Sequence, residues 1–277
     1  MPSTTTPQNT DGPCLSFDTA APYVQYGHID TLHALQQPRT THPSERDFIL
    51  TTQIMELLFH TIIHRWEHAR TALENDDPRT ALTWLKRATH AQDVLVESWQ
   101  LLADLKPTEF AQFRDHLGPA SGFQSYTYRH MEFLLGNKST AVLTTHTATP
   151  HIHHQLHQAL HQPSLYDAAL RLLARRGLPV PSHATQRDWS QPHQPDPQVE
   201  QAWIQVYRGH DPEALDLAET LLDTAERHTR WRHRHLHAVK RVLGAKPGTG
   251  GSSGLHWLEQ AAQQDVFTEL WSLRSTL

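Results

Sequence analysis

The sequence predicts an all-α protein, and two observations carry this prediction. Apolar residues recur at alternating spacings of three and four over long stretches, which is the period of a helix with one buried face. Alternation with a period of two, the pattern of a half-buried strand, is confined to brief runs. We therefore expect a helical bundle, and 277 residues are enough for one large domain or two small ones.

The first long helix is predicted from Ser44 to about Glu74. Ser44 and Asp47 resemble a capping box, which satisfies the free N–H groups at a helix start. The expected buried face of this helix has one polar member, Thr52, and consists of Phe48, Thr52, Met55, Phe59, Ile62, Trp66 and Ala69.

Proline at the first helical position, where it is tolerated, marks several later helices. Asp77-Pro78 begins a second helix that runs to about Leu105, and Pro107 begins a short third one that runs to Leu117. The remaining predicted elements are a helix ending at Gly136 after a break at 118–122, two helices within 151–176, a loop over 178–197, the longest helix from Asp211-Pro212 to Leu243, a helix over 255–264 and a short last helix to Leu277.

Residues 1–20 are predicted to be a disordered tail, and residues 21–277 one helical domain with a variable loop at about 178–197. The segment 1–11 has neither the basic nor the apolar region of a secretory signal. The single cysteine, Cys14, cannot form an internal disulfide, so a reducing cytoplasm fits best. No apolar run approaches the roughly 18 residues that span a bilayer. A net charge of -5 gives no electrostatic footprint for nucleic acid.

Four of the 12 glycines fall within residues 248–254, directly after the longest predicted helix. Glycines leave N–H groups uncovered and permit positive φ, so such a loop can bring bare backbone close to a ligand. The alternative is a flexible turn between helices. A phosphate loop is disfavoured because no strand precedes the segment and the Gly-x-x-x-x-Gly-Lys order is missing.

His235 lies upstream of this loop at helical spacing with Trp231 and Val239. It is therefore expected on a buried apolar stripe, whereas His233 and His237 are expected to face solvent. A buried histidine at such a position is either a core residue or a ligand for a metal or a haem iron. Position alone leaves both alternatives open.

The chain has 23 histidines, and a short segment holds five of them. His151, His153, His154, His157 and His161 include pairs four residues apart that could bind zinc or nickel. Because no His-Glu-x-x-His motif accompanies them, a solvated polar helix face is the favoured interpretation.

Arg114 lies four residues after Phe110 on the same side of the short third helix. This places a cationic fork beside an aromatic wall. A guanidinium matches a carboxylate through two parallel hydrogen bonds, so an amino-acid carboxylate is a candidate ligand. A solvated arginine is the alternative.

Two long motifs contain these residues. One is Phe110-x-x-Phe113-Arg114-x-x-Leu117-x-Pro119-Ala120-Ser121-Gly122-Phe123-Gln124-Ser125. The other is His235-x-x-x-Val239-x-Arg241-x-Leu243-Gly244-x-Lys246-x-Gly248-Thr249-Gly250-Gly251-Ser252-Ser253-Gly254. Shorter ones are Tyr23-x-x-Tyr26 with Gln36-Gln37-Pro38, Gln53-x-x-Glu56-Leu57 and Glu269-Leu270-Trp271-x-Leu273-Arg274. Together they resemble the tryptophan 2,3-dioxygenase family from about residue 22 to the C-terminus, most weakly between 140 and 200.

The resemblance implies an all-helical homotetramer that holds non-covalent haem b, with ferrous iron for O2 activation and L-tryptophan or a derivative as substrate. His235 matches the proximal iron ligand, and Arg114 matches the residue that grips the substrate carboxylate. The expected neighbours of the haem are Ser121, Gly122, Trp231 and Val239. The expected substrate contacts are Thr249 at the ammonium and carboxylate ends, Phe48, Phe110 and Leu117 around the indole, and Tyr23 and Tyr26 from a neighbouring subunit.

At one position the sequence departs from the family pattern. The family has a distal histidine directly before the Gln of a His-Gln-x-x-Glu-Leu segment, where it hydrogen-bonds the indole N–H, and this chain has Thr52. Threonine cannot act as an imidazole base, although its hydroxyl can accept from an N–H or hold a water. The superfamily includes secondary-metabolism branches that hydroxylate aromatic amino acids or form 2-oxindoles, and Thr52 favours such a branch.

The sequence therefore predicts a haem-dependent oxidoreductase acting on the indole C2=C3 bond of L-tryptophan or a substituted tryptophan, for example a β-methyl one. Because the pattern fails at Thr52, insertion of one oxygen atom to give a 2-oxindole-type product is favoured, which would consume an external reductant. The alternatives are ordinary tryptophan 2,3-dioxygenation to N-formylkynurenine and a haem-binding protein without turnover. Neither a nucleic-acid nor a membrane partner is expected.

Overall fold

The computed structural model describes residue 12 and residues 15–251 and 253–277. Every regular element among these residues is a helix, which confirms the predicted all-α class. The chain divides into two compact units, residues 1–38 and residues 39–277. The predicted tail at 1–20 lies mostly outside the described residues, and both this tail and a single domain from residue 21 stay predictions. Among the described helices, none combines the length and apolar character needed to cross a membrane.

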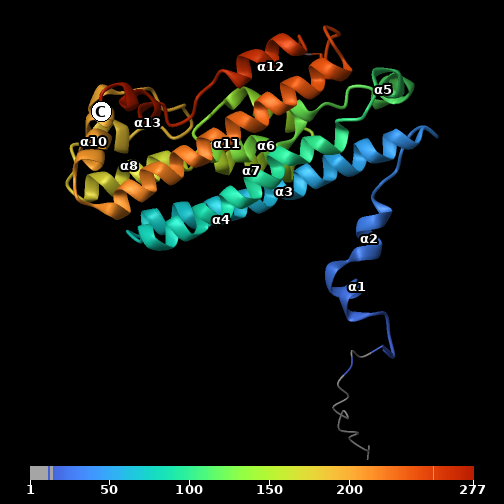
Figure 1. Ribbon diagram of the computed structural model, residues 1–277, viewed down its shortest axis with the longest axis horizontal. Coiled ribbons are helices and arrows are strands. Elements are labelled where there is room, and N and C mark those ends of the chain that lie inside the picture. Colours follow the sequence, from blue (N-terminus) through green and yellow to red (C-terminus); the bar gives the residue numbers. More distant parts are fainter. Residues whose placement is uncertain (1–11, 13–14, 252) are drawn as a thin grey trace, which may run out of the picture. The chain divides into compact units, whose positions relative to one another are not determined.

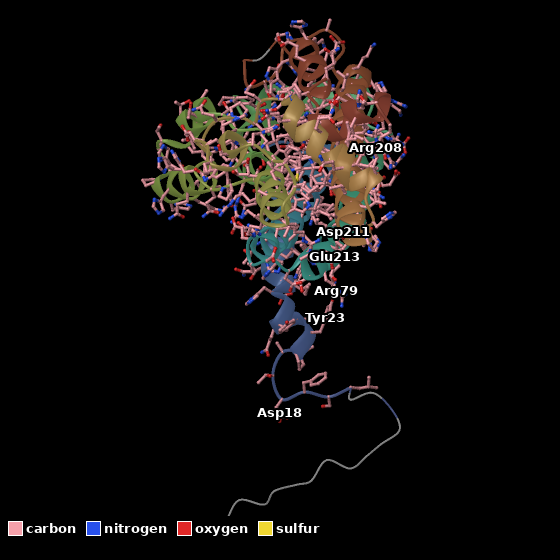
Figure 2. The ribbon with its side chains drawn as sticks, turned by 90° about the vertical axis from the view of Figure 1, so that its left-hand side faces the viewer. Asp18, Tyr23, Arg79, Arg208, Asp211 and Glu213 are labelled. Atoms are coloured by element: carbon pink, nitrogen blue, oxygen red, sulfur yellow. The ribbon has the colours of Figure 1, made fainter. Side chains whose placement is uncertain are left out.

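The first unit contains two short helices, α1 (Pro22–Gly27) and α2 (Ile29–Ala34). Neither buries a residue. Tyr23 and Tyr26 of α1 are 77% and 93% exposed, and Figure 2 labels Tyr23. Because helices this short are marginal in water without a packed face, α1 and α2 gain little stability from this unit itself.

The second unit is built on two long helices, α3 (Pro43–Glu74) and α11 (Pro212–Val242), and α4 (Pro78–Glu97) packs against both (Figure 1). With 32 residues, α3 exceeds the 31 residues of α11, which was predicted to be the longest. The other α-helices of this unit are α5 (Pro107–Arg114), α6 (Tyr126–Leu134), α7 (Pro150–Leu160), α8 (Leu165–Arg175), α9 (Ser182–Thr185), α10 (Pro197–Arg208), α12 (Leu255–Ala262) and α13 (Thr268–Ser272). Its 3₁₀ helices are η1 (Ser98–Leu102), η2 (Asp115–Leu117), η3 (Gly122–Gln124), η4 (Thr140–His146) and η5 (Leu273–Ser275).

Aspartate caps hold the starts of α4 and α11, as predicted. Asp77 accepts the backbone N–H of Thr80 at 3.0 Å, and Asp211 accepts that of Glu213 at 3.1 Å. Figure 2 labels Asp211 and Glu213 at the start of α11, where Arg176 donates to both carboxylates. Each cap satisfies an N–H group that has no partner inside its helix.

The start of α3 differs from the predicted capping box. Because the helix begins at Pro43, the N-cap is His42 and not Ser44, and the Nδ1 of His42 accepts the Ser44 N–H at 3.3 Å. The carboxylate of buried Glu45 accepts two backbone N–H bonds of 2.7 Å from residues 39 and 40. This carboxylate therefore fixes the chain that enters α3.

The main hydrophobic core of the second unit is formed by buried residues of α3, α4, α6, α8, α10 and α11, with contributions from α9 and α13. The helical period leads from Met55 back to both Thr51 and Thr52, and Thr51 is the buried one, at 3% exposure. Thr52 is exposed and Phe48 is half-buried, so the placement of Thr52 on the buried face is wrong. The other predicted members of that face are buried, namely Met55, Phe59, Ile62, Trp66 and Ala69.

Downstream of α6, the described residues form two α-helices that were not predicted, α9 and α10, and the 3₁₀ helix η4. α7 and α8 are the two helices predicted within 151–176. The predicted loop over 178–197 holds the single-turn α9, and α10 follows it. Asp196 caps α10 by accepting the Gln198 N–H at 2.7 Å, and fully buried Trp203 anchors this helix in the core.

Candidate functional site

The predicted site residues of the second unit come from the elements around its short helix α5. α5 packs against both α3 and α11, near the end of the unit where α3 begins and α11 finishes (Figure 1). The glycine loop, residues 248–254, follows α11. Residue 252 of this loop lies outside the described part of the chain.

Three phenylalanine rings form an aromatic wall between α3 and α5. The ring centroid of Phe48 lies 5.8 Å from that of Phe110 and 5.7 Å from that of Phe113. Phe110 and Phe113 meet edge to face at 5.2 Å, a preferred aromatic geometry. Leu117, on η2 directly after α5, is half-buried. The structure therefore brings together Phe48 and Phe110, two of the three apolar residues predicted to surround the indole.

Thr52 lies one helical turn after Phe48. Its hydroxyl donates a hydrogen bond of 3.0 Å to the carbonyl oxygen of Phe48, four residues earlier in α3. This bond fixes the side chain along the helix. Thr52, which the sequence analysis expected at the distal position of the pocket, therefore lies one helical turn from Phe48 of the aromatic wall.

Arg114 joins α5 to the chain that leads into the glycine loop. Its Nη2 donates to the carbonyl oxygen of Pro247 at 2.8 Å, and its Nη1 lies 3.8 Å from the exposed carboxylate of Asp115. The Nε of Arg114 is buried and has no hydrogen-bond partner among the described residues. Since orphaned buried donors are rare, this guanidinium has spare capacity for an anionic ligand.

The glycine loop meets the turn at residues 119–122. Thr249 donates a hydrogen bond of 2.6 Å from Oγ1 to the carbonyl oxygen of Ala120. A Cβ atom added at Gly250 would lie 2.7 Å from the Cβ of half-buried Ser121, closer than real Cβ contacts come. Gly122, at the end of the turn, is exposed. The close backbone approach expected of the glycines is therefore made to this turn.

His235 is half-buried on α11 and is held by indole rings. It stacks on Trp99 of η1, with centroids 4.7 Å apart and planes 13° apart, and Trp231 lies 5.6 Å away. Burial lowers the pKa of His235 to about 4, so the ring is neutral near pH 7. No described residue hydrogen-bonds either ring nitrogen. A neutral imidazole with free nitrogens fits an iron ligand, and half-buried Val239 lies one turn further along α11.

His233 and His237 are exposed, as predicted for the opposite face of α11. They line an open groove of about 650 Å³. The groove includes neither His235 nor Arg114, so we place the candidate site elsewhere, at the residues around α5. The residues lining the groove are Glu226, Thr229, Arg230, His233, Arg234, His237, Asp265 and Trp271.

The histidine-rich segment lies on α7. His151, His154, His157 and His161 are exposed, and His153 is half-buried, which agrees with a solvated helix face. The ring centroids of His157 and His161 lie 4.3 Å apart. Across residues 12, 15–251 and 253–277, no group of three His, Cys, Asp or Glu side chains is arranged to hold a metal ion.

Two features near the candidate site were not predicted from the sequence. Trp99, on which His235 stacks, was expected inside the second predicted helix, which was to run to about Leu105. α4 instead ends at Glu97, and Trp99 lies on the 3₁₀ helix η1. The second feature is a buried ionic cluster of Arg129, Glu132 and Arg232. The three-residue spacing of Arg129 and Glu132 signals a pair on one helix face, but only the fold brings in Arg232.

Comparison with known proteins shows which family of proteins this chain belongs to. The family model described as tryptophan 2,3-dioxygenase matches residues 8–212 and 204–277. The chain is 40% identical over 263 residues to the tryptophan 2,3-dioxygenase of Geobacillus thermodenitrificans, covering 94% of each protein. It is also 40% identical over 265 residues to tryptophan 2,3-dioxygenase 1 of Ralstonia nicotianae and to tryptophan 2,3-dioxygenase of Bordetella parapertussis, with 95% of this chain and 90% and 93% of those proteins covered.

These matches show that the chain is an oxidoreductase of the oxygenase class. It belongs to the tryptophan 2,3-dioxygenase family, which confirms the resemblance found in its motifs.

Proposed function

We propose that the protein is a haem-dependent oxygenase that adds both atoms of O2 across the indole C2=C3 bond of L-tryptophan, giving N-formylkynurenine. Family membership and the names of the relatives support this two-atom outcome over the one-atom outcome that Thr52 suggests. The observation that carries the proposal is the tether between Arg114 and the segment entering the glycine loop, which follows the helix of His235.

His235 would ligate the haem iron, with Ser121, Gly122, Trp231 and Val239 around the cofactor. When bound, haem supplies the iron that activates O2. Burial keeps the His235 imidazole neutral, and the Trp99 stack fixes the plane of its ring. Orienting a neutral imidazole in advance is what the protein contributes to ligation.

The substrate would be held at both ends. Arg114 would bind its carboxylate through the guanidinium, and Thr249 would contact the ammonium and carboxylate ends. The apolar side chains would exclude water from the indole and fix its orientation, which removes much of the entropic barrier to reaction. These side chains are Phe48, Phe110 and Leu117.

We also propose a cytoplasmic homotetramer with shared sites, in which Tyr23 and Tyr26 reach a neighbouring subunit. Their exposure of 77% and 93% in one chain supports this role. Light scattering should give about four times the 31.7 kDa chain mass. Removing residues 1–26 should damage activity but leave haem bound, and a fully active monomer would overturn the shared site.

The second candidate, one-atom oxygenation of tryptophan or a β-substituted tryptophan, rests on Thr52. It requires an external reductant, because the second oxygen atom must leave as water. The test is mass spectrometry of products formed under labelled O2, with reductant consumption followed in parallel. Two labelled atoms without reductant consumption would establish the dioxygenase, whereas one labelled atom with stoichiometric consumption would overturn it. In the second case Thr52→His should move the products toward two labelled atoms.

A further inference from the structure

We propose that Glu132 is a positioning residue that holds two walls of the candidate site in register through two buried arginines. One wall is the turn at residues 119–124, and the other is α11 next to His235. This inference rests on the proposed function, because it concerns the same site. It is argued from the ion pairs and hydrogen bonds of Arg129, Glu132 and Arg232, which have no role in the proposed chemistry.

The three charged side chains form one buried cluster. Arg129, Glu132 and Arg232 are only 5%, 6% and 4% exposed. The two carboxylate oxygens of Glu132 are divided between the arginines: Oε2 accepts from Nη1 of Arg129, and Oε1 accepts from Nη2 of Arg232 at 3.2 Å. Asn137 adds a hydrogen bond of 3.1 Å to Oε1. Glu132 is thus the acceptor common to both arginines.

Arg129 carries the link to the first wall. Its Nε and Nη2 both donate to the carbonyl oxygen of Phe123, at 3.2 and 3.1 Å, and its guanidinium lies 4.5 Å from the centre of the Phe123 ring. Phe123 belongs to η3, which Ser121 caps by accepting the Phe123 N–H at 3.3 Å. Ser121 is the residue against which Gly250 packs. A displacement of Arg129 would therefore reach the glycine loop.

Arg232 carries the link to the second wall. It lies on α11 three residues before His235, close to one helical turn. Its Nη1 donates to the carbonyl oxygen of Gln264, just after α12, at 2.8 Å, and its Nε lies 3.4 Å from the Tyr128 hydroxyl. Arg232 thus fixes α11 against the chain that follows the glycine loop.

The charge balance makes Glu132 the critical member. One carboxylate faces two guanidinium groups, so its removal would leave two buried cations without a counter-charge. Removing one partner of a buried ion pair is costly because the remaining charge stays desolvated. The arginines would separate or draw in water, and each would move the wall that it holds.

The test compares Glu132→Gln with Asp167→Asn. Asp167 is a fully buried carboxylate that accepts two hydrogen bonds from Arg187, at 2.9 and 3.0 Å, and both residues lie outside the proposed site. Both variants should lower the thermal midpoint. Only Glu132→Gln should shift the Soret band of the haem-loaded protein and lower kcat/KM for tryptophan, by at least about tenfold, since misplacing groups by an ångström costs up to about 100-fold.

Amide hydrogen exchange of the haem-free chain gives a readout that needs no activity. Glu132→Gln should raise exchange in residues 119–124 and 248–254, whereas Asp167→Asn should not. Equal effects of the two variants on the Soret band, on kcat/KM and on exchange would overturn the inference. A parent protein that binds no haem would instead contradict the proposed function, while the exchange comparison would still decide the role of Glu132.

If Glu132→Gln does not fold, Arg129→Lys tests the same link. Lysine keeps a positive charge beside Glu132 but cannot direct two N–H groups at the Phe123 carbonyl oxygen. It should raise exchange in residues 119–124 and leave haem bound to His235. Unchanged exchange in that turn would overturn the proposal.

Discussion

Arg114 on α5 donates a hydrogen bond of 2.8 Å to the carbonyl oxygen of Pro247, 133 residues later in the chain. This bond crosses from α5 to the segment that enters the glycine loop. Because the Nε of Arg114 has no partner in the described part of the chain, the same guanidinium can hold the loop and still bind an anion.

Arg114→Ala should lower kcat/KM for tryptophan by about 30-fold or more, since losing one side of a desolvated charge pair costs about 2–5 kcal/mol. Steady-state kinetics measures this loss. Arg176→Ala is the control, because Arg176 pairs with Asp211 and Glu213 at the start of α11 and should leave kcat/KM unchanged. Tryptamine binding as tightly as tryptophan would contradict the assignment.

His235→Ala should abolish or strongly weaken haem binding, because it removes the neutral, half-buried imidazole stacked on Trp99. Haem titration followed at the Soret band measures the affinity. His233→Ala and His237→Ala change exposed residues of the same helix and should bind haem as the parent does. Equal haem loss in all three variants would mean that another residue is the ligand.

Gly250→Ala should displace the glycine loop, because its new Cβ would lie 2.7 Å from the Cβ and 2.9 Å from the Oγ of Ser121. We expect a higher KM for tryptophan, measured by steady-state kinetics. The double variant Ser121→Gly/Gly250→Ala should recover much of this loss. Gly209→Ala is the control, since its Cβ would meet the Gln205 carbonyl oxygen at 2.9 Å, beside α10 and outside the site. It should cost stability and leave KM unchanged.

Acidification should destabilise the haem-free protein through His228. Burial, with Arg232 as a second cause, lowers the pKa of His228 well below its ordinary value, and burial lowers that of His235 to about 4. Below about pH 6.5 the unfolded chain takes up protons that the folded chain refuses, so stability falls as pH falls. The carboxylates Glu67 and Glu269 have lowered pKa values and act below about pH 4.5, so they leave this window to the histidines.

Urea unfolding between about pH 5 and 6.5 measures this effect. His228→Gln should reduce the slope of the unfolding free energy against pH by up to about 1.4 kcal/mol per pH unit, the contribution of one proton. An unchanged slope would contradict the assignment to His228.

Local chemistry predicted most of the fold. The caps at Asp77 and Asp211 and the buried stripe from Met55 to Ala69 depend on residues a few positions apart, and the structure agrees with them. Thr52 was misplaced because a period of 3.6 does not distinguish positions three and four before Met55. Packing of α3 against its neighbours decides between them.

The candidate site could be predicted less completely than the fold. Its motifs indicated His235 and Arg114, but the contacts of these side chains join residues more than 100 positions apart. The stack on Trp99 and the sharing of Glu132 by two arginines depend on how helices pack, which local spacing does not encode.

The hydrogen bond from Thr52 to the Phe48 carbonyl oxygen gives this side chain a fixed polarity. A hydroxyl has one proton to donate, and here the Phe48 carbonyl oxygen accepts it, so only lone pairs would be available to a bound substrate. Thr52 could then accept a hydrogen bond from a ring N–H, but it could not donate one to a ring heteroatom that carries only a lone pair. Indole would be preferred over benzofuran or an N-methylated indole at this position, and the pocket would discriminate between ring heteroatoms without any acid or base.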